Sequence, residues 1–210
     1  MQLKELSTAS GVSAASIKFY LREGLIQRGE QVHPTRAEYG QLHLRRLELI
    51  GALRSVVGLG IEQIRTLVQL IDDPEVSRLE LLGRTQALVL GAPGEDAADH
   101  PLVAELLTSQ GWPDAPSDAR ALFNRTLEEM EGMGLSVSSD VVRGYAEAAD
   151  QVAQQDLGTV FDAGSRDEAV LAVAVGVRAY SKLLLSLVAL AQASHSIKRL
   201  SGDEDRGTAT

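Results

Sequence analysis

The sequence predicts a mainly α-helical protein, in which an N-terminal winged helix-turn-helix precedes an all-helical C-terminal half. Apolar residues recur at helical spacing along most of the 210 residues, and no convincing alternating strand follows residue 74. A glycine turn at Gly11 separates two short amphipathic segments near the N-terminus. Charge also divides the chain. Residues 1–70 hold nine Lys or Arg and six Asp or Glu, a net charge of +3, whereas residues 71–210 hold eleven and 23, a net charge of −12. This asymmetry indicates a basic module joined to an acidic one with a different task.

The first two helices are specified by their local residues. Leu3, Leu6 and Ala9 form an apolar stripe on the first helix. Gly11 suits the left-handed position that closes a helix, and Ser13 is a good N-cap for the next one. In a helix-turn-helix the second helix enters the DNA major groove, so residues 13–23 are the expected recognition helix. On the helical pattern alone, a surface hairpin with scattered basic residues is the alternative.

The following segments predict a wing and two supporting helices. Residues 25–27 are short and apolar enough for a small strand, and residues 28–36 are typical of a loop or wing. A helix is predicted from about Tyr39 to Val57, where Gly58 and Gly60 interrupt it. A further helix over residues 61–71 should stop near Asp72-Asp73-Pro74.

These segments together resemble a known family. The matching motifs are Gly11-Val12-Ser13, Ile17-Lys18-Phe19-Tyr20, Arg22-Glu23-Gly24-Leu25-Ile26, Tyr39 with Arg46-Leu47, and Gly58-Leu59-Gly60-Ile61-Glu62-Gln63-Ile64. In this order and spacing, residues 2–71 resemble the DNA-binding domain of the MerR family of bacterial transcriptional regulators. The resemblance implies a homodimer on a pseudo-palindromic promoter, with RNA polymerase at that promoter and an effector bound by the C-terminal domain.

The expected DNA contacts combine this resemblance with the chemistry of the side chains. By position, Tyr20 and Arg22 would contact phosphates, and Arg36 would be the wing arginine. Lys and Arg neutralise phosphates and give affinity without sequence information, whereas base readout needs the exposed face of the recognition helix. The residues expected to contact DNA are Ser13, Ala14, Ser16, Lys18, Phe19, Tyr20, Arg22, Arg36 and Tyr39.

The acidic half predicts five more helices, near residues 75–90, 99–110, 117–132, 138–157 and 166–200. We therefore divide the chain into a DNA-binding domain (1–73), a short helix and linker (74–98), a helical effector-binding and dimerisation domain (99–200) and a disordered tail (201–210).

The last helix is the stronger candidate for a dimer seam, although the helix at 75–90 stays open as an alternative. A 3-4-3-4 spacing of apolar residues over about four heptads is typical of helix pairing. The helix is apolar on other faces as well, which predicts packing both on its own domain and on a partner subunit. Arg178 and Lys182 lie within it and disfavour a membrane span. The predicted seam residues are Val170, Val173, Val177, Tyr180, Leu184, Leu187 and Ala191.

An effector site is expected among the large side chains of the acidic half, since such side chains line ligand pockets as well as ordinary cores. The candidates are Trp112, Phe123, Tyr145, Phe161, Tyr180 and His195. No metal or cofactor is expected, because the chain lacks cysteine and its histidines show no ligand spacing.

Two other functions were weighed. A constitutive or architectural regulator, whose C-terminal half only dimerises, is the main alternative to an effector-controlled one. An enzyme is disfavoured, since no nucleophile–base pair or glycine-rich phosphate loop is evident. Lys4 and Glu5 interrupt the first apolar residues, so a secretory signal is not expected and a cytoplasmic location is.

Overall fold

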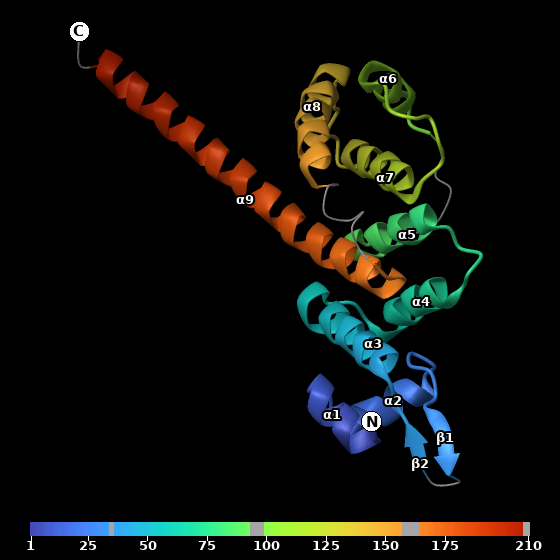
Figure 1. Ribbon diagram of the computed structural model, residues 1–210. Coiled ribbons are helices and arrows are strands. Elements are labelled where there is room, and N and C mark those ends of the chain that lie inside the picture. The colour runs from blue at the N-terminus through green and yellow to red at the C-terminus, as the bar shows by residue number, and fades with distance from the viewer. Residues whose placement is uncertain (34–35, 93–98, 157–163, 208–210) are drawn as a thin grey trace.

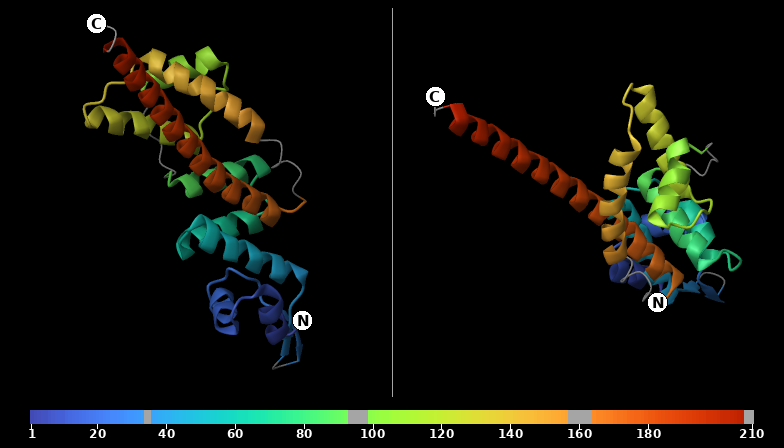
Figure 2. Two further views of the ribbon diagram at one scale, coloured as in Figure 1. Left: turned by 90° about the vertical axis from the view of Figure 1, so that its left-hand side faces the viewer. Right: turned by 90° about the horizontal axis from the view of Figure 1, so that it is seen from above.

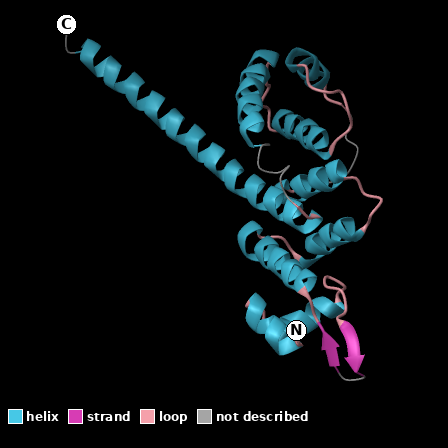
Figure 3. Ribbon diagram, viewed as in Figure 1, coloured by secondary structure: helices cyan, strands magenta, loops and turns pink. Residues whose placement is uncertain are grey.

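The computed structural model describes residues 1–33, 36–92, 99–156 and 164–207, and within them the chain is almost entirely helical (Figures 1 and 3). The predicted mainly α fold is therefore confirmed. The elements, in chain order, are α1 (Leu3–Ser10), α2 (Ala14–Arg22), β1 (Glu30–His33), β2 (Arg36–Glu38), α3 (Gln41–Ala52), the π-helical turn η1 (Leu53–Val57), α4 (Ile61–Asp72), α5 (Arg78–Leu90), α6 (Pro101–Gln110), α7 (Asp118–Gly132), α8 (Ser139–Asp156) and α9 (Arg166–Gly207).

The helix-turn-helix forms as its sequence predicts. Gly11 has a φ of 67°, in the left-handed region that closes α1. The Ser13 hydroxyl caps α2 by accepting the Ser16 backbone N–H at 3.1 Å. Leu6 and Ile17 are fully buried between the helices. The turn is thus fixed by one glycine, one cap and an apolar contact.

The wing lies later in the chain than the small strand that we predicted. Residues 25–27 do not form a strand, because Leu25 and Ile26 instead fill the core below α2. The hairpin is built by β1 and β2, which pair antiparallel. Gly29 lies at its base, where a β-carbon would come within 2.6 Å of the Glu38 carbonyl oxygen. Only glycine permits this close approach.

The core of the N-terminal domain continues into later parts of the chain. Leu47, Ile50 and Leu67 of α3 and α4 are fully buried. Leu81 of α5 and Val170 of α9 belong to the same apolar cluster and are also fully buried. The apolar core therefore continues across the domain boundary that the sequence predicted between residues 73 and 74.

Helices α6, α7 and α8 build a second, smaller unit with its own apolar cluster around Val103 and Leu127. Its polar support is a network at the start of α6. The Arg120 guanidinium donates to Asp99 at 2.9 and 2.7 Å, and the buried Asn124 side chain bonds both Asp99 and the His100 backbone N–H. Figure 1 shows this unit above α5.

Helix α9 dominates the shape of the molecule. Its 42 residues span about 63 Å at 1.5 Å per residue. Its first turns pack against α3 and α5, and the remainder runs away from the other helices (Figures 1 and 2). The helix continues to Gly207, beyond the end predicted at residue 200 and into the segment expected to be disordered. By length and composition alone, Arg166–Ser201 is also long and apolar enough to cross a membrane.

Candidate DNA interface and the junction behind it

The recognition helix α2 presents one polar face to solvent. Ser13, Ala14, Lys18 and Arg22 are exposed, and Ser16 is half-buried beside the Ser13 hydroxyl. The opposite face is held in the core by Ile17. Because the buried side fixes the helix, its exposed side is displayed without competing contacts from the rest of the domain. Ala14, Lys18 and Arg22 share one side of the helix by spacing, and their chemistry suits a phosphate backbone and base edges.

Two of the predicted contact residues lie in the core instead. Tyr20 is 5% exposed, and its hydroxyl accepts a hydrogen bond from the Arg54 guanidinium at 3.2 Å. Tyr39 is 9% exposed and its ring meets His43 edge-on. Phe19 is half-buried and tilted against Tyr20. Phe19 and Tyr20 therefore support the recognition surface from behind, whereas Tyr39 packs against α3 through His43.

Two supporting arginines were missed in the sequence. Arg54 lies in the π-helical turn η1 and reaches Tyr20 of α2. Arg65 of α4 pairs with Glu23 at the end of α2 and with Glu62 one turn earlier. Hydrogen bonding to Glu62 is the main cause that raises the pKa of Arg65. The pairing with Glu62 follows helical spacing, but the contacts with α2 join residues more than 30 positions apart and leave no local signal.

The wing exposes Gln31, Val32 and His33 to solvent. Arg36 begins β2, and its side chain lies outside the described residues. The expected phosphate contact by Arg36 is therefore a prediction still. The hairpin stands next to α2 at the same end of the molecule (Figure 1). The wing and recognition helix thus lie together, as a winged helix-turn-helix requires.

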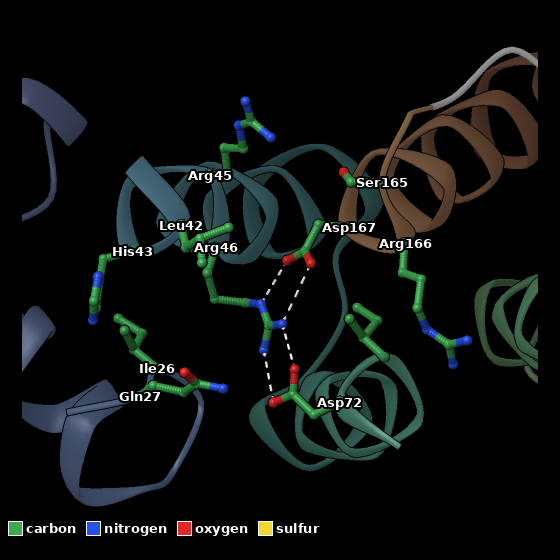
Figure 4. Close-up of a pocket in the computed structure, with 11 residues that line it drawn as sticks. Ile26, Gln27, Leu42, His43, Arg45, Arg46, Asp72, Ser165, Arg166 and Asp167 are labelled. Atoms are coloured by element: carbon green, nitrogen blue, oxygen red, sulfur yellow. Dashed lines mark hydrogen bonds and ion pairs between the residues drawn. The ribbon is translucent and has the colours of Figure 1, made fainter. Parts of the chain in front are cut away.

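Behind this interface, Arg46 joins three elements at one point (Figure 4). It projects from α3 between Asp72, the last residue of α4, and Asp167, the second residue of α9. Its Nε donates to Asp167 at 2.6 Å, and its Nη2 donates to Asp72 at 2.6 Å. Burial acts to lower the pKa of Arg46, but the hydrogen bonds to Asp72 and Asp167 outweigh it and hold that pKa above its ordinary value. The guanidinium therefore stays charged and ties α9 to the DNA-binding domain.

Arg166 makes a second link at the same place. Its guanidinium donates to the backbone carbonyls of Leu70 at 2.6 Å, Val76 at 2.8 Å and Asp73 at 3.1 Å. The carbonyls at the end of α4 have no partners within their helix, and a cation is favourable there. We call Arg46, Asp72, Arg166 and Asp167 the junction. Its contacts with α9 join residues that are 90 to 121 positions apart.

A cavity of about 330 Å³ opens at the junction. Its apolar lining comes from Ile26, Leu42 and Ile71, and its polar lining includes Gln27 and the junction side chains. This is near the lower limit of size for small-molecule sites. Of the predicted effector residues, none that the structure describes lines this cavity.

Comparison with known proteins agrees with this geometry. Residues 1–71 match the model of the MerR HTH family regulatory protein. Over these residues the chain is similar to the MerR-type DNA-binding domain. The HTH-type transcriptional regulator CueR of Escherichia coli is 28% identical over 130 residues, covering 50% of this chain and 93% of that protein. CueR of Salmonella typhimurium is also 28% identical, over 50% of this chain and 91% of its own.

A solved structure matches nearly the whole chain. The crystal structure of SCO5550 from Streptomyces coelicolor A3(2), a proposed transcriptional regulator, has a TM-score of 0.62 and 28% identity, with coverage of 95% of this chain and 97% of that one. The MerR-type domain and these relatives support DNA-binding transcriptional regulation, as the helix-turn-helix predicted. The family consists of regulators rather than enzymes.

Beyond the MerR-type domain, the predicted effector residues lie apart. Trp112 and Phe123 pack beside the α6–α8 cluster, and the Trp112 indole N–H donates to Asp150 at 2.9 Å. Tyr145 projects from α8 and is 68% exposed, while Tyr180 and His195 lie on the exposed part of α9. Phe161 lies outside the described residues. Within one chain, the described members of this set do not converge on a single pocket.

The predicted dimer seam is divided along the length of α9. Val170 and Val173 are buried within their own chain and Val177 is half-buried. Tyr180, Leu184, Leu187 and Ala191 are exposed. We predicted that one side of the helix would face its own domain and another side a partner. Within the chain, the first third of the helix packs on its own domain and the remainder is exposed. Packing on a partner stays a prediction.

No group of three His, Asp or Glu side chains in residues 1–33, 36–92, 99–156 and 164–201 is arranged to hold a metal ion.

Proposed function

We propose that the protein binds a pseudo-palindromic promoter in a sequence-specific manner as a homodimer, and that a small organic effector modulates it. The observation that carries the first part is the exposed face of α2. Lys18 and Arg22 are free in solvent on a helix whose other side is buried, and Ser13 fixes its N-terminus. The basic charges supply phosphate affinity, and the short polar side chains near the N-cap offer base readout. The partners would be promoter DNA and RNA polymerase, in the cytoplasm.

Dimerisation is proposed to use the free part of α9. Large apolar side chains remain exposed there, including Leu183 at 51%, Leu187 at 53% and Leu190 at 64%. A soluble chain rarely exposes a continuous apolar surface of this extent without a partner. Arg178 and Lys182 lie on the opposite side of the helix by spacing, which suits a helix pair in water better than a membrane span. Two copies of α9 would connect two DNA-binding domains on two half-sites.

The junction supports communication between DNA and the rest of the chain. Helix α9 is bound to α3 and α4 by Arg46 and Arg166, so a change in the tilt of α9 must move these two helices or break charged hydrogen bonds. Arg65 of α4 in turn pairs with Glu23 at the end of the recognition helix. An effector that binds the C-terminal helices would act through these contacts. A constitutive regulator is the second candidate, favoured by the scattering of the predicted effector residues.

The test starts from DNA selected out of genomic fragments by the purified full-length chain. Fluorescence anisotropy would then measure the affinity of that DNA for wild type, Lys18→Ala and Arg22→Ala from 50 to 300 mM salt. Each variant should bind more weakly and lower the log–log salt slope by about one if its residue neutralises one phosphate. Arg178→Ala is the matched control, because this exposed arginine lies on the side of α9 opposite the proposed seam, and the variant should behave as wild type. If the three variants are indistinguishable, α2 is not the recognition helix.

The effector proposal has its own probe, because Trp112 is the sole tryptophan of the chain. A library of amphipathic compounds would be screened by Trp112 fluorescence and by thermal shift, and hits would be tested on DNA affinity. A hit that changes both supports an effector site near α6–α8. A ligand that shifts melting and DNA affinity but not Trp112 fluorescence would favour the junction cavity.

A further inference from the structure

Helix α8 carries a second apolar face that is not used within the chain. Its buried side packs Val142 and Ala146 into the α6–α8 cluster. Its outer side exposes Val141 at 50% and Tyr145 at 68%. Three small exposed residues follow Val141 or Tyr145 at a spacing of three or four positions, namely Gly144, Ala148 and Ala149. A helix face of small residues with one protruding aromatic side chain allows another helix to pack closely against it.

The free part of α9 has more apolar surface than one partner helix covers. At 100° per residue, Tyr180, Leu184, Leu187 and Ala191 fall within a narrow stripe, which is the predicted seam. Leu183, Leu190 and Ile197 form a second row at heptad spacing, about 80° to one side, and are 51%, 64% and 65% exposed. We call this row the flank. A two-helix seam would leave the flank in water, so the pairing of two α9 helices requires a further covering element.

The net charges of the helices indicate which element covers the flank. Residues 169–201 of α9 hold four Lys or Arg and no Asp or Glu, a net charge of +4. Residues 99–156, which contain α6, α7 and α8, hold three Lys or Arg and eleven Asp or Glu, a net charge of −8. The acidic α6–α8 unit is therefore electrostatically complementary to the basic free part of α9. The apolar flank and the charges therefore both favour the α6–α8 unit as the covering element.

The covering α6–α8 unit belongs to a second copy of the chain. Figures 1 and 2 show α9 leaving the helices of its own chain, so that its C-terminal half lies clear of them. We propose that the outer face of α8 in one subunit docks on the Leu183–Leu190–Ile197 flank of α9 in its partner. This inference rests on the proposed homodimer and adds a second interface to it. Each α6–α8 unit would then contact the α9 helix that carries the other DNA-binding domain.

Site-directed disulfide formation tests this directly, because the chain has no cysteine of its own. Tyr145→Cys and Leu190→Cys would be placed in two full-length chains with different tags, mixed, and oxidised under mild conditions. The expected product is a disulfide-linked heterodimer on a non-reducing gel. Glu147→Cys, exposed on another side of α8, and Leu185→Cys, 71% exposed and off the flank, form the matched control pair. The Tyr145–Leu190 pair should link at least tenfold faster than the control pair.

The possible results distinguish a failure of α8 docking from a failure of the proposed homodimer. A Leu187→Cys chain that links to itself, with no preference for the Tyr145–Leu190 pair, would keep the homodimer and refute α8 docking. An intrachain disulfide in the Tyr145→Cys/Leu190→Cys double variant would also refute it, because α8 would then cover its own α9. A monomer in light scattering at micromolar concentration would refute both, as would co-flotation of that monomer with phosphatidylglycerol vesicles. In support, Leu190→Lys should raise the dimer dissociation constant about tenfold or more, while Leu185→Lys leaves it unchanged.

Discussion

Replacing Arg46 by Met tests the junction, because it removes the guanidinium while keeping most of the apolar stem. The Arg46 side chain is 12% exposed, and its partners Asp72 and Asp167 are 37% and 22% exposed. The change would lose four hydrogen bonds and leave two carboxylates facing each other. Removing one member of a fully buried ion pair costs about 3–5 kcal/mol, and hydrogen bonds to charged groups contribute about 1.5–3 kcal/mol. Because both carboxylates can regain water, we expect a loss of about 2–3 kcal/mol in the free energy of unfolding.

The assay is urea unfolding followed by circular dichroism, together with calorimetry of the full-length chain. For a chain of this size the loss corresponds to a fall in Tm of roughly 4–12 °C. Arg45→Met is the matched control on the same helix, since its guanidinium lies 3.7 Å from Glu168 and both side chains are about half exposed. Such a surface pair contributes about 0–1 kcal/mol. Equal losses in the two variants would show that the junction does not stabilise the contact between α9 and the DNA-binding domain.

Three further predictions concern the turn, the seam and the acidic unit. Gly11→Ala should destabilise the chain by about 1–2 kcal/mol in urea unfolding, from backbone strain alone, because φ is +67° and an added β-carbon meets no atom within 4 Å. Leu187→Asp should raise the dimer dissociation constant about 100-fold or more in sedimentation velocity, since both subunits lose a buried leucine at a symmetric seam; an unchanged dimer would exclude this part of α9. Hydrogen bonds, first from Arg120 and then from Asn124, lower the pKa of Asp99, so its stabilising effect is complete above its unfolded pKa and is lost as pH falls through the lower folded value. Trp112 fluorescence should therefore report loosening of the α6–α8 unit below about pH 4, and Asp99→Asn should remove that part of the pH dependence.

The sequence determined the elements that depend on nearby residues. The turn needed only Gly11, the cap Ser13 and an apolar stripe, which are all within a few positions of one another. The helices of the C-terminal half also depend on nearby residues. The predicted helices therefore agree with the structure to within a few residues at most ends. The basic face of α2 was visible for the same reason, since exposure on a helix follows from spacing against its buried side.

Only the tertiary structure decided which residues lie together across long separations. Tyr20 and Tyr39 are among the predicted DNA contacts, and only the structure shows that both rings are largely buried in the core. Their contact with DNA stays a prediction. Leu25 and Ile26 had strand-like composition, yet burial against the helices outweighed that tendency. The junction joins Arg46 to Asp167 across 121 positions, and no periodicity records such a contact. The approximate length of α9 could be predicted from its apolar pattern. Which part of it is buried depends on where α3 and α5 lie, because burial is set by the neighbours that pack on a helix.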